Sequence, residues 1–163
     1  MEKLLVDELN EYLSVDDFIR DIKWEKTNLV VQNNMTHICL LTKKVYKNDY
    51  DNYMITINDE LKLVFPNIVF DFCIYNYIKK CDTLLNLKSD GMSLLLILGG
   101  DITIVVDNKT FLLKNGNHIF VNKLSYYFPL QKHDDNKLLL CFGIDEKMSK
   151  PKKIIKFMKP IRK

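Results

Sequence analysis

Residues 94–145 read LLLILGGDITIVVDNKTFLLKNGNHIFVNKLSYYFPLQKHDDNKLLLCFGID. Short apolar runs alternate in this stretch with Gly-Gly, Asp-Asn and Asn-Gly pairs, which favour tight turns. Many short strands separated by turn signals are typical of a β-sandwich or barrel. The stretch therefore predicts a mainly β protein that contains a small antiparallel barrel. A closed barrel can hold a small ligand in its interior or serve as an assembly surface.

The clearest local feature is a hairpin. Ile102–Val106 and Thr110–Leu113 flank Asp107-Asn108-Lys109, a short turn whose residues tolerate positive φ. Asn115-Gly116 follows and is suited to a second tight turn. Further strands are expected from alternating or β-branched patterns, at Leu29–Gln32, His37–Thr42, Tyr53–Ile57, Leu61–Phe65, 68–77, 117–122 and 137–144.

The amino-terminal segment has a helical pattern instead. Leucines recur at helical spacing within the first 13 residues. Ser14 followed by Asp17 resembles a capping arrangement that starts a second short helix, with Phe18, Ile19 and Ile22 on one face. Between the two expected strands at 53–57 and 61–65, Asn58-Asp59 is expected to turn the chain.

Charge is unevenly distributed along the chain. The net charge is +3, but residues 149–163 hold seven Lys or Arg and no acid, so residues 1–148 carry 17 bases and 21 acids, a net of −4. An acidic body with a basic tail is not typical of a dedicated nucleic-acid-binding domain. We divide the chain into a helical segment (1–24), a β-barrel domain (25–148) and a basic tail or linker (149–163).

The sequence favours a cytoplasmic protein without a membrane partner. No apolar run approaches the roughly 20 residues that span a bilayer, and the first residues lack the pattern of a signal peptide. The four cysteines have no CxxC spacing, so we expect free, buried thiols in a reducing compartment.

Residues 94–145 resemble the double-stranded β-helix (cupin) fold, a jelly-roll barrel, and within it the N-terminal sensor domains of AraC-type transcription regulators. Leu113, Lys114, Gly116 and Asn122 fit the turn and strand positions of those domains, and residues 138–145 are similar to their later strand. The resemblance implies a small effector in the barrel interior and a homodimer.

The sequence departs from enzymatic cupins at the metal site. Those enzymes hold a metal with a His-x-His…Glu set and a later histidine, because an open site activates a bound water or dioxygen. Here Ser93 lies near the place of the glutamate and Tyr127 near that of the later histidine. We therefore expect no metal, no cofactor and no catalytic residue. A less favoured alternative is a metal-dependent enzyme with unusual ligands, chosen from Cys73, Cys141, His118 and Asp90.

A second departure concerns DNA reading. AraC-type regulators read DNA with helix-turn-helix units on the order of a hundred residues long, but only fifteen residues follow Met148 here. Direct sequence-specific DNA binding by this chain alone is not expected. The leading hypothesis is a non-catalytic sensing and dimerisation domain of a transcription regulator. The alternative is a structural or protein-interaction module with a filled barrel.

The candidate ligand-binding residues are His118, Phe120, Asn122 and Tyr127. The face on which the first three lie is undecided by the sequence, because successive side chains of a strand point to opposite faces. If Ile119 and Val121 face the interior, the barrel is dry and filled. If His118, Phe120 and Asn122 face it, the pocket is polar.

Overall fold

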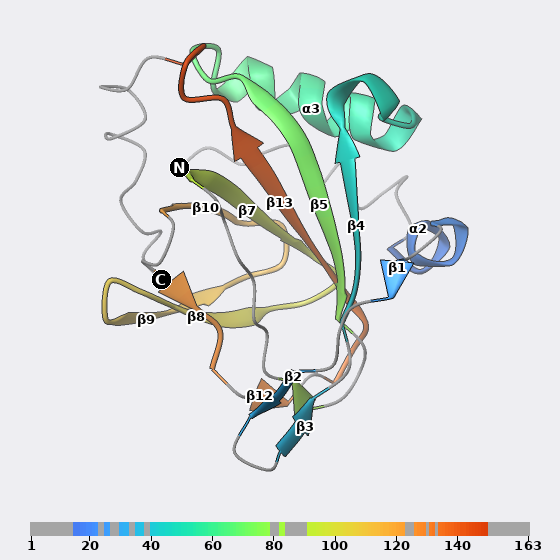
Figure 1. The fold of residues 1–163 in the computed structure, drawn as a ribbon, viewed down its shortest axis with the longest axis vertical. Coiled ribbons are helices and arrows are strands. Elements are labelled where there is room, and N and C mark those ends of the chain that lie inside the picture. The colour runs from blue at the N-terminus through green and yellow to red at the C-terminus, as the bar shows by residue number, and fades with distance from the viewer. Residues whose placement is uncertain are drawn as a thin grey trace.

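The computed structural model describes residues 15–22, 25–26, 30–32, 35–37, 40–78, 82–83, 91–122, 126–129, 131–132 and 134–149. Within these ranges the chain is mainly β, with antiparallel sheets and few helices (Figure 1). The predicted fold class is confirmed at this level. The helix expected within the first 13 residues lies outside the described residues, as does the basic tail after Ser149.

Two sheets make up most of the fold. The larger has six antiparallel strands, in spatial order β1 (Glu25–Lys26), β4 (Leu40–Tyr46), β5 (Phe70–Ile78), β13 (Lys137–Ile144), β7 (Ser93–Leu98) and β10 (His118–Val121). The smaller has the order β11 (Tyr126–Tyr127), β8 (Ile102–Val106) and β9 (Lys109–Leu113). Two short pairs are added by β2 (Val30–Gln32) with β3 (Met35–His37), and by β6 (Asp82–Thr83) with β12 (Gln131–Lys132).

The predicted hairpin is confirmed. Val106 pairs with Lys109, so Asp107 and Asn108 form a two-residue turn with φ values of 49° and 65°. Positive φ at both central residues is what a tight turn between twisted strands requires, and Asp and Asn tolerate it. Gly116 has φ 87° in the next turn, as the Asn-Gly pair predicts.

The strands predicted at Tyr53–Ile57 and Leu61–Phe65 are wrong. The structure has one helix there, α3 (Asn52–Val64), and Asn58-Asp59 lies inside it rather than in a turn. The side chain of Asp51 caps this helix by accepting a hydrogen bond from the Met54 backbone N–H at 2.9 Å. Apolar residues three and four positions apart, Met54, Ile57 and Leu61, are buried on one side, which is the helical period.

Two helical elements precede α3 in the described residues. The short helix α2 (Val15–Asp21) confirms the second helix expected from the sequence, and its Phe18 is buried. A 3₁₀ turn, η1 (Lys47–Asp49), connects β4 to α3. In Figure 1, α3 lies across one end of β4, β5 and β13.

The six-stranded sheet separates two apolar cores. On one face, side chains of α2, α3 and the sheet form the helix-side core, which includes Phe18, Met54, Leu61, Leu96 and Leu140. On the other face, side chains of the two sheets form the inter-sheet core, which includes Leu95, Ile104, Ile119, Val121 and Leu139. Every residue of β7 and β13 is buried, because both faces of these central strands are covered.

Two cysteines and Ser149 are buried in this packing. Cys73 and Cys141 are free and buried, as expected from the sequence, whereas Cys39 and Cys81 lie outside the described residues. Ser149, the first residue of the predicted tail, is buried, and its hydroxyl accepts a hydrogen bond from the Val69 backbone N–H at 3.0 Å.

Gly143 offers a test of the packing. A Cβ at this position would overlap the ring of Phe72, whereas a Cβ at Gly91 would meet only the flexible end of Glu146, at 3.0 Å. We expect Gly143→Ala to lower the free energy of unfolding by roughly 1–3 kcal/mol, the usual cost of overpacking, with a much smaller change for Gly91→Ala. Urea denaturation of both variants measures this difference.

The ring of Phe72 is the cause to be tested. The cost of Gly143→Ala should therefore shrink when it is combined with Phe72→Ala. An equal cost in both backgrounds, or equal stability of Gly143→Ala and the natural protein, would contradict this packing.

Candidate functional site

The register of β10 decides where the predicted ligand-binding residues point. Phe120 pairs with Leu94 of β7 and belongs to the helix-side core. Ile119 and Val121 belong to the inter-sheet core. The structure therefore has the first of the two alternatives, in which Ile119 and Val121 face the interior.

His118 and Phe120 are brought together, but on the helix side of the sheet. The His118 ring lies 5.3 Å from the Phe65 ring and 5.9 Å from the Phe120 ring, both edge to face, and Phe65 and Phe120 are 5.1 Å apart. Burial among these groups lowers the pKa of His118 to about 4. The imidazole is therefore neutral at neutral pH and packs as an aromatic side chain.

The other two predicted residues, Tyr127 and Asn122, do not form a pocket with His118 and Phe120. Tyr127 is on β11 in the smaller sheet, and its side chain is 58% exposed. Asn122 follows β10 and is half-buried. A ligand-binding role for these four residues stays a prediction.

The space between the sheets is occupied by side chains. The inter-sheet core is built from residues that are at most 4% exposed; they are Ile78, Leu95, Ile97, Ile102, Ile104, Val106, Leu113, Ile119, Val121, Phe128, Leu139 and Cys141. Asn76 is a polar residue on the same face of β5. Its Nδ2 donates to the carbonyl oxygens of Leu139 (3.1 Å) and Ile74 (3.3 Å), while its Oδ1 has no hydrogen-bond partner among the described residues.

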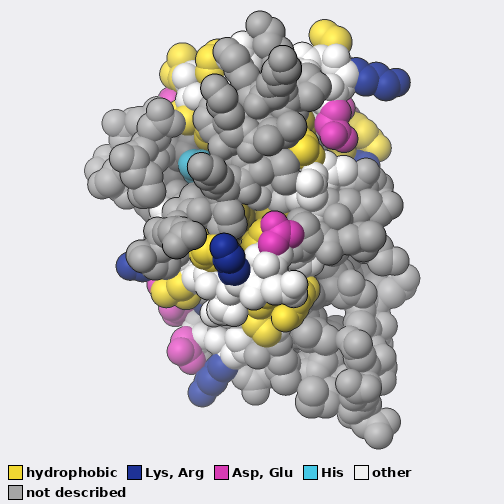
Figure 2. Space-filling view, turned by 90° about the vertical axis from the view of Figure 1, so that its left-hand side faces the viewer, with side chains coloured by type: hydrophobic (Ala, Val, Ile, Leu, Met, Phe, Trp, Pro, Cys, Tyr) yellow, Lys and Arg dark blue, Asp and Glu magenta, His cyan; other side chains and the backbone are white. Residues whose placement is uncertain are grey.

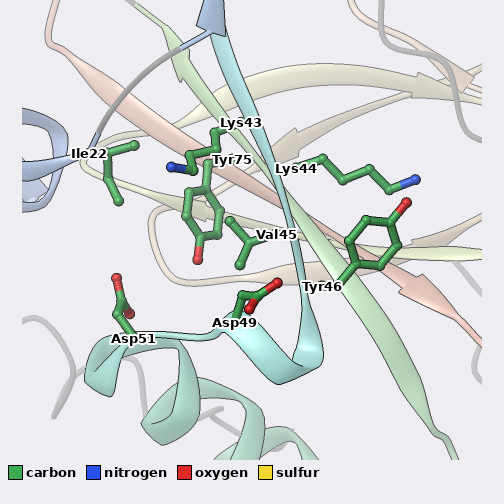
Figure 3. Close-up of a pocket in the computed structure, with 8 residues that line it drawn as sticks. All are labelled: Ile22, Lys43, Lys44, Val45, Tyr46, Asp49, Asp51 and Tyr75. Carbon is green, nitrogen blue, oxygen red and sulfur yellow. The ribbon is translucent and has the colours of Figure 1, made fainter.

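A pocket of about 400 Å³ lies on the other side of the six-stranded sheet, where α2, β4, η1 and the start of α3 meet (Figure 3). This volume falls in the range of small-molecule sites. We call this cavity the helix-side pocket. The side chains that converge on it in Figure 3 are Ile22, Lys43, Val45, Asp49, Asp51 and Tyr75. Lys44 and Tyr46 also border the cavity, but their side chains leave β4 on its opposite face (Figure 3), where Lys44 Nζ lies 5.0 Å from the centre of the Tyr46 ring.

Strand pairing places the pocket residues. Lys43 and Val45 are two apart on β4, so they share a face, and they pair with Tyr75 and Cys73 of β5. The Tyr75 ring is held by an edge-to-face contact with Phe18 of α2, with ring centres 5.3 Å apart. Its hydroxyl points towards the acidic side of the pocket, where Asp49 and Asp51 lie (Figure 3).

Tyr75 is the most buried polar group of the pocket. The residue is 1% exposed, and its hydroxyl lies in the cavity (Figure 3). Burial raises the pKa of the hydroxyl far above its usual range, and the neighbouring Cys73 and Asp51 raise it further. The group therefore stays protonated and can donate a hydrogen bond into the cavity.

None of the six residues of the helix-side pocket is among the predicted site residues. Lys43 and Val45 lie just beyond the strand predicted at His37–Thr42, and Asp49 and Asp51 lie between that strand and the one predicted at Tyr53–Ile57. The capping signal at Asp51 was available in the sequence, since an Asp before a run with apolar residues at helical spacing predicts a helix start. The contact between β4 and α2 depends on tertiary packing, so no local pattern in the sequence predicts it.

The described residues contain no group of three His, Cys, Asp or Glu side chains arranged to hold a metal ion. None of the helices within the described ranges is both long and apolar enough to cross a membrane.

No protein-family model matches the sequence, and no curated protein matches it. Among solved structures, the chain is similar to an oxidoreductase of the 2OG-Fe(II) oxygenase family from Burkholderia pseudomallei, with a TM-score of 0.51 and 13% identity over 83% of this chain and 78% of that one. It is more distantly similar to the cupin domain of Schizosaccharomyces pombe Cnp3 (TM-score 0.43, 13% identity, 78% and 72% covered) and to a cupin-superfamily protein from Desulfitobacterium hafniense (0.42, 14%, 76% and 84%). At such identities the likeness concerns the fold alone.

His118 gives the aromatic cluster a pH dependence. Its folded pKa of about 4 lies below the ordinary value of 6.5, so between these values the unfolded chain binds a proton that the folded chain does not. Folding stability should therefore fall as pH drops from 6.5 to 4. Each pH unit contributes about 1.4 kcal/mol, so the loss reaches about 3 kcal/mol at most.

Denaturation at several pH values measures this loss. His118→Gln removes the titrating group, so its stability should vary less between pH 6.5 and 4 than that of the natural protein. Parallel curves for the two proteins would show that His118 does not titrate as described.

Proposed function

We propose that the chain is a non-catalytic module of the double-stranded β-helix (cupin-like) type that binds a small molecule in the helix-side pocket. The observation that carries this proposal is the cavity of about 400 Å³ with the hydroxyl of the buried Tyr75 pointing into it. A hydrogen bond from a ligand to this hydroxyl would contribute to affinity, because polar groups at buried sites are stabilised by hydrogen-bond partners.

The proposal moves the ligand away from the interior expected from the sequence. The inter-sheet core is filled by aliphatic and aromatic side chains, so a ligand there would have to displace packed groups, each worth about 1.5–3 kcal/mol when buried. The helix-side pocket is already open and combines apolar walls, Ile22 and Val45, with polar groups that can fix an orientation.

The regulatory part of the proposal comes from the resemblance to AraC-type sensor domains. A ligand between α2 and the sheet would set the position of α2, and an amino-terminal helix that responds to an effector could pass this change to a partner copy. We accordingly propose a homodimeric sensor in a transcription regulator, without direct DNA reading by this chain. Sedimentation of the full chain as a monomer at high concentration would contradict the dimer.

The charges on the face shown in Figure 2 agree with a partner other than nucleic acid. On the face shown in Figure 2, Lys or Arg and Asp or Glu side chains of the described residues lie next to one another rather than in separate patches. A footprint for phosphate groups would need a patch or stripe of cations. A purely structural or protein-interaction module is the second candidate, and the filled inter-sheet core favours it.

Titration with a library of small molecules tests the proposal. The full chain labelled with ¹⁵N is screened by NMR, and hits should shift backbone amides of α2, β4 and η1 rather than those of Ile119 and Val121. Ile22→Trp fills part of the pocket and should abolish the shifts, because the indole occupies the ligand volume. Tyr127→Ala, on the exposed face of the smaller sheet, is the matched control and should leave them unchanged.

The other outcomes are equally informative. Shifts centred on Ile119 and Val121, or loss of binding in Tyr127→Ala, would return the ligand to the site expected from the sequence. Indifference to the whole library would contradict ligand binding and favour the interaction module.

A further inference from the structure

The helix-side pocket carries charges of both signs. Asp49 and Asp51 border it on the side of η1 and the start of α3, and Lys43 borders it from β4. In Figure 3, Tyr75 stands between the lysine and the two carboxylates, with its hydroxyl towards the carboxylates. The pocket thus has an acidic end and a basic end, joined by a hydrogen-bond donor.

The charged residues of the pocket differ in exposure and in the hydrogen bonds that they already make. Asp51 already uses one carboxylate oxygen, which accepts the Met54 N–H at 2.9 Å and caps α3. Asp49 and Asp51 are both exposed, and Lys43 is half-buried on the pocket face of β4. Ile22 and Val45, between these groups, offer only apolar contact.

We infer that the pocket selects a small zwitterion, an amino-acid-type molecule whose ammonium group binds at Asp49 and Asp51 and whose carboxylate binds at Lys43. Its hydrocarbon part lies on Ile22 and Val45, and the Tyr75 hydroxyl, at the acidic end, accepts a hydrogen bond from the ammonium group. This inference rests on the proposed function and names its ligand class.

Charge complementarity argues for a zwitterion over an ion of one sign. A ligand with only an ammonium group would leave Lys43 without a partner and its own positive charge near that lysine. A ligand with only a carboxylate would face two negative groups, and like charges at short range disfavour binding. Hydrogen bonds between charged groups are stronger than neutral ones, so pairing both ends should give most of the affinity.

Five-carbon probes separate these alternatives. The isomers 5-aminopentanoate and norvaline are both zwitterions that differ in the separation of their charges, while pentylamine and pentanoate keep one charge each. Isothermal titration of the full chain should show at least one zwitterion binding about tenfold or more tightly than either singly charged probe, since each charge-assisted hydrogen bond lost weakens binding by about that factor or more.

Variants assign the two ends of the ligand. Lys43→Met and Asp49→Asn should each weaken zwitterion binding about tenfold, with Lys109→Met and Asp59→Asn, exposed residues outside the pocket, as matched controls without effect. Asp51 is left intact because it caps α3. Tyr75→Phe keeps the ring packed on Phe18 and should weaken binding by a smaller factor, through the lost hydroxyl alone.

The outcomes distinguish this inference from the proposed function. If pentylamine or pentanoate binds as tightly as both zwitterions, or if the library screen finds pocket ligands of another class while both zwitterions fail, the zwitterion assignment is overturned and the pocket remains a binding site. If neither the zwitterions nor any library compound shifts the amides of α2, β4 and η1, both statements are overturned.

Discussion

The structure depends on the burial of β7 and β13 from both sides. A strand whose two faces are both covered must be apolar at every position, and these two strands have almost no polar residue. Their odd and even side chains enter different cores, so the six-stranded sheet holds the helices on one face and the smaller sheet on the other. A shift of either strand by one residue would move every side chain to the opposite core.

This constraint also explains why the interior is filled. Leu95, Ile97, Leu139 and Cys141 all point between the sheets, where they meet Ile102 and Ile104 from β8. The pairing of β10 with β7 then orients Ile119 and Val121 inwards as well. His118 and Phe120 are left for the helix side, where Phe65, just after α3, packs against both rings.

Local signals in the sequence were sufficient for the hairpin of β8 and β9 and for the central strand β13. The turn at Asp107-Asn108 and the strand at 137–144 follow from turn chemistry and from apolar runs, which act over a few residues. The helix α3 was missed because Tyr53–Ile57 and Leu61–Phe65, which cover most of it, were interpreted as strands; the cap at Asp51 favours the helix. The pocket was missed because α2 and β4 meet only after folding.

The position of the pocket has a consequence for how a ligand could act. Tyr75 belongs to β5, a strand fixed by pairing on both sides. Phe18 belongs to a seven-residue helix that is too short to be stable by itself, and Ile22 directly follows this helix. Contacts with the sheet therefore hold α2, and Phe18 on Tyr75 is one of them. A ligand that bonds the Tyr75 hydroxyl and packs on Ile22 adds to the same contacts. Binding would then be linked to the placement of α2. A ligand that binds more tightly when α2 is docked on the sheet stabilises the docked state by the difference between its binding free energies for the docked and undocked states.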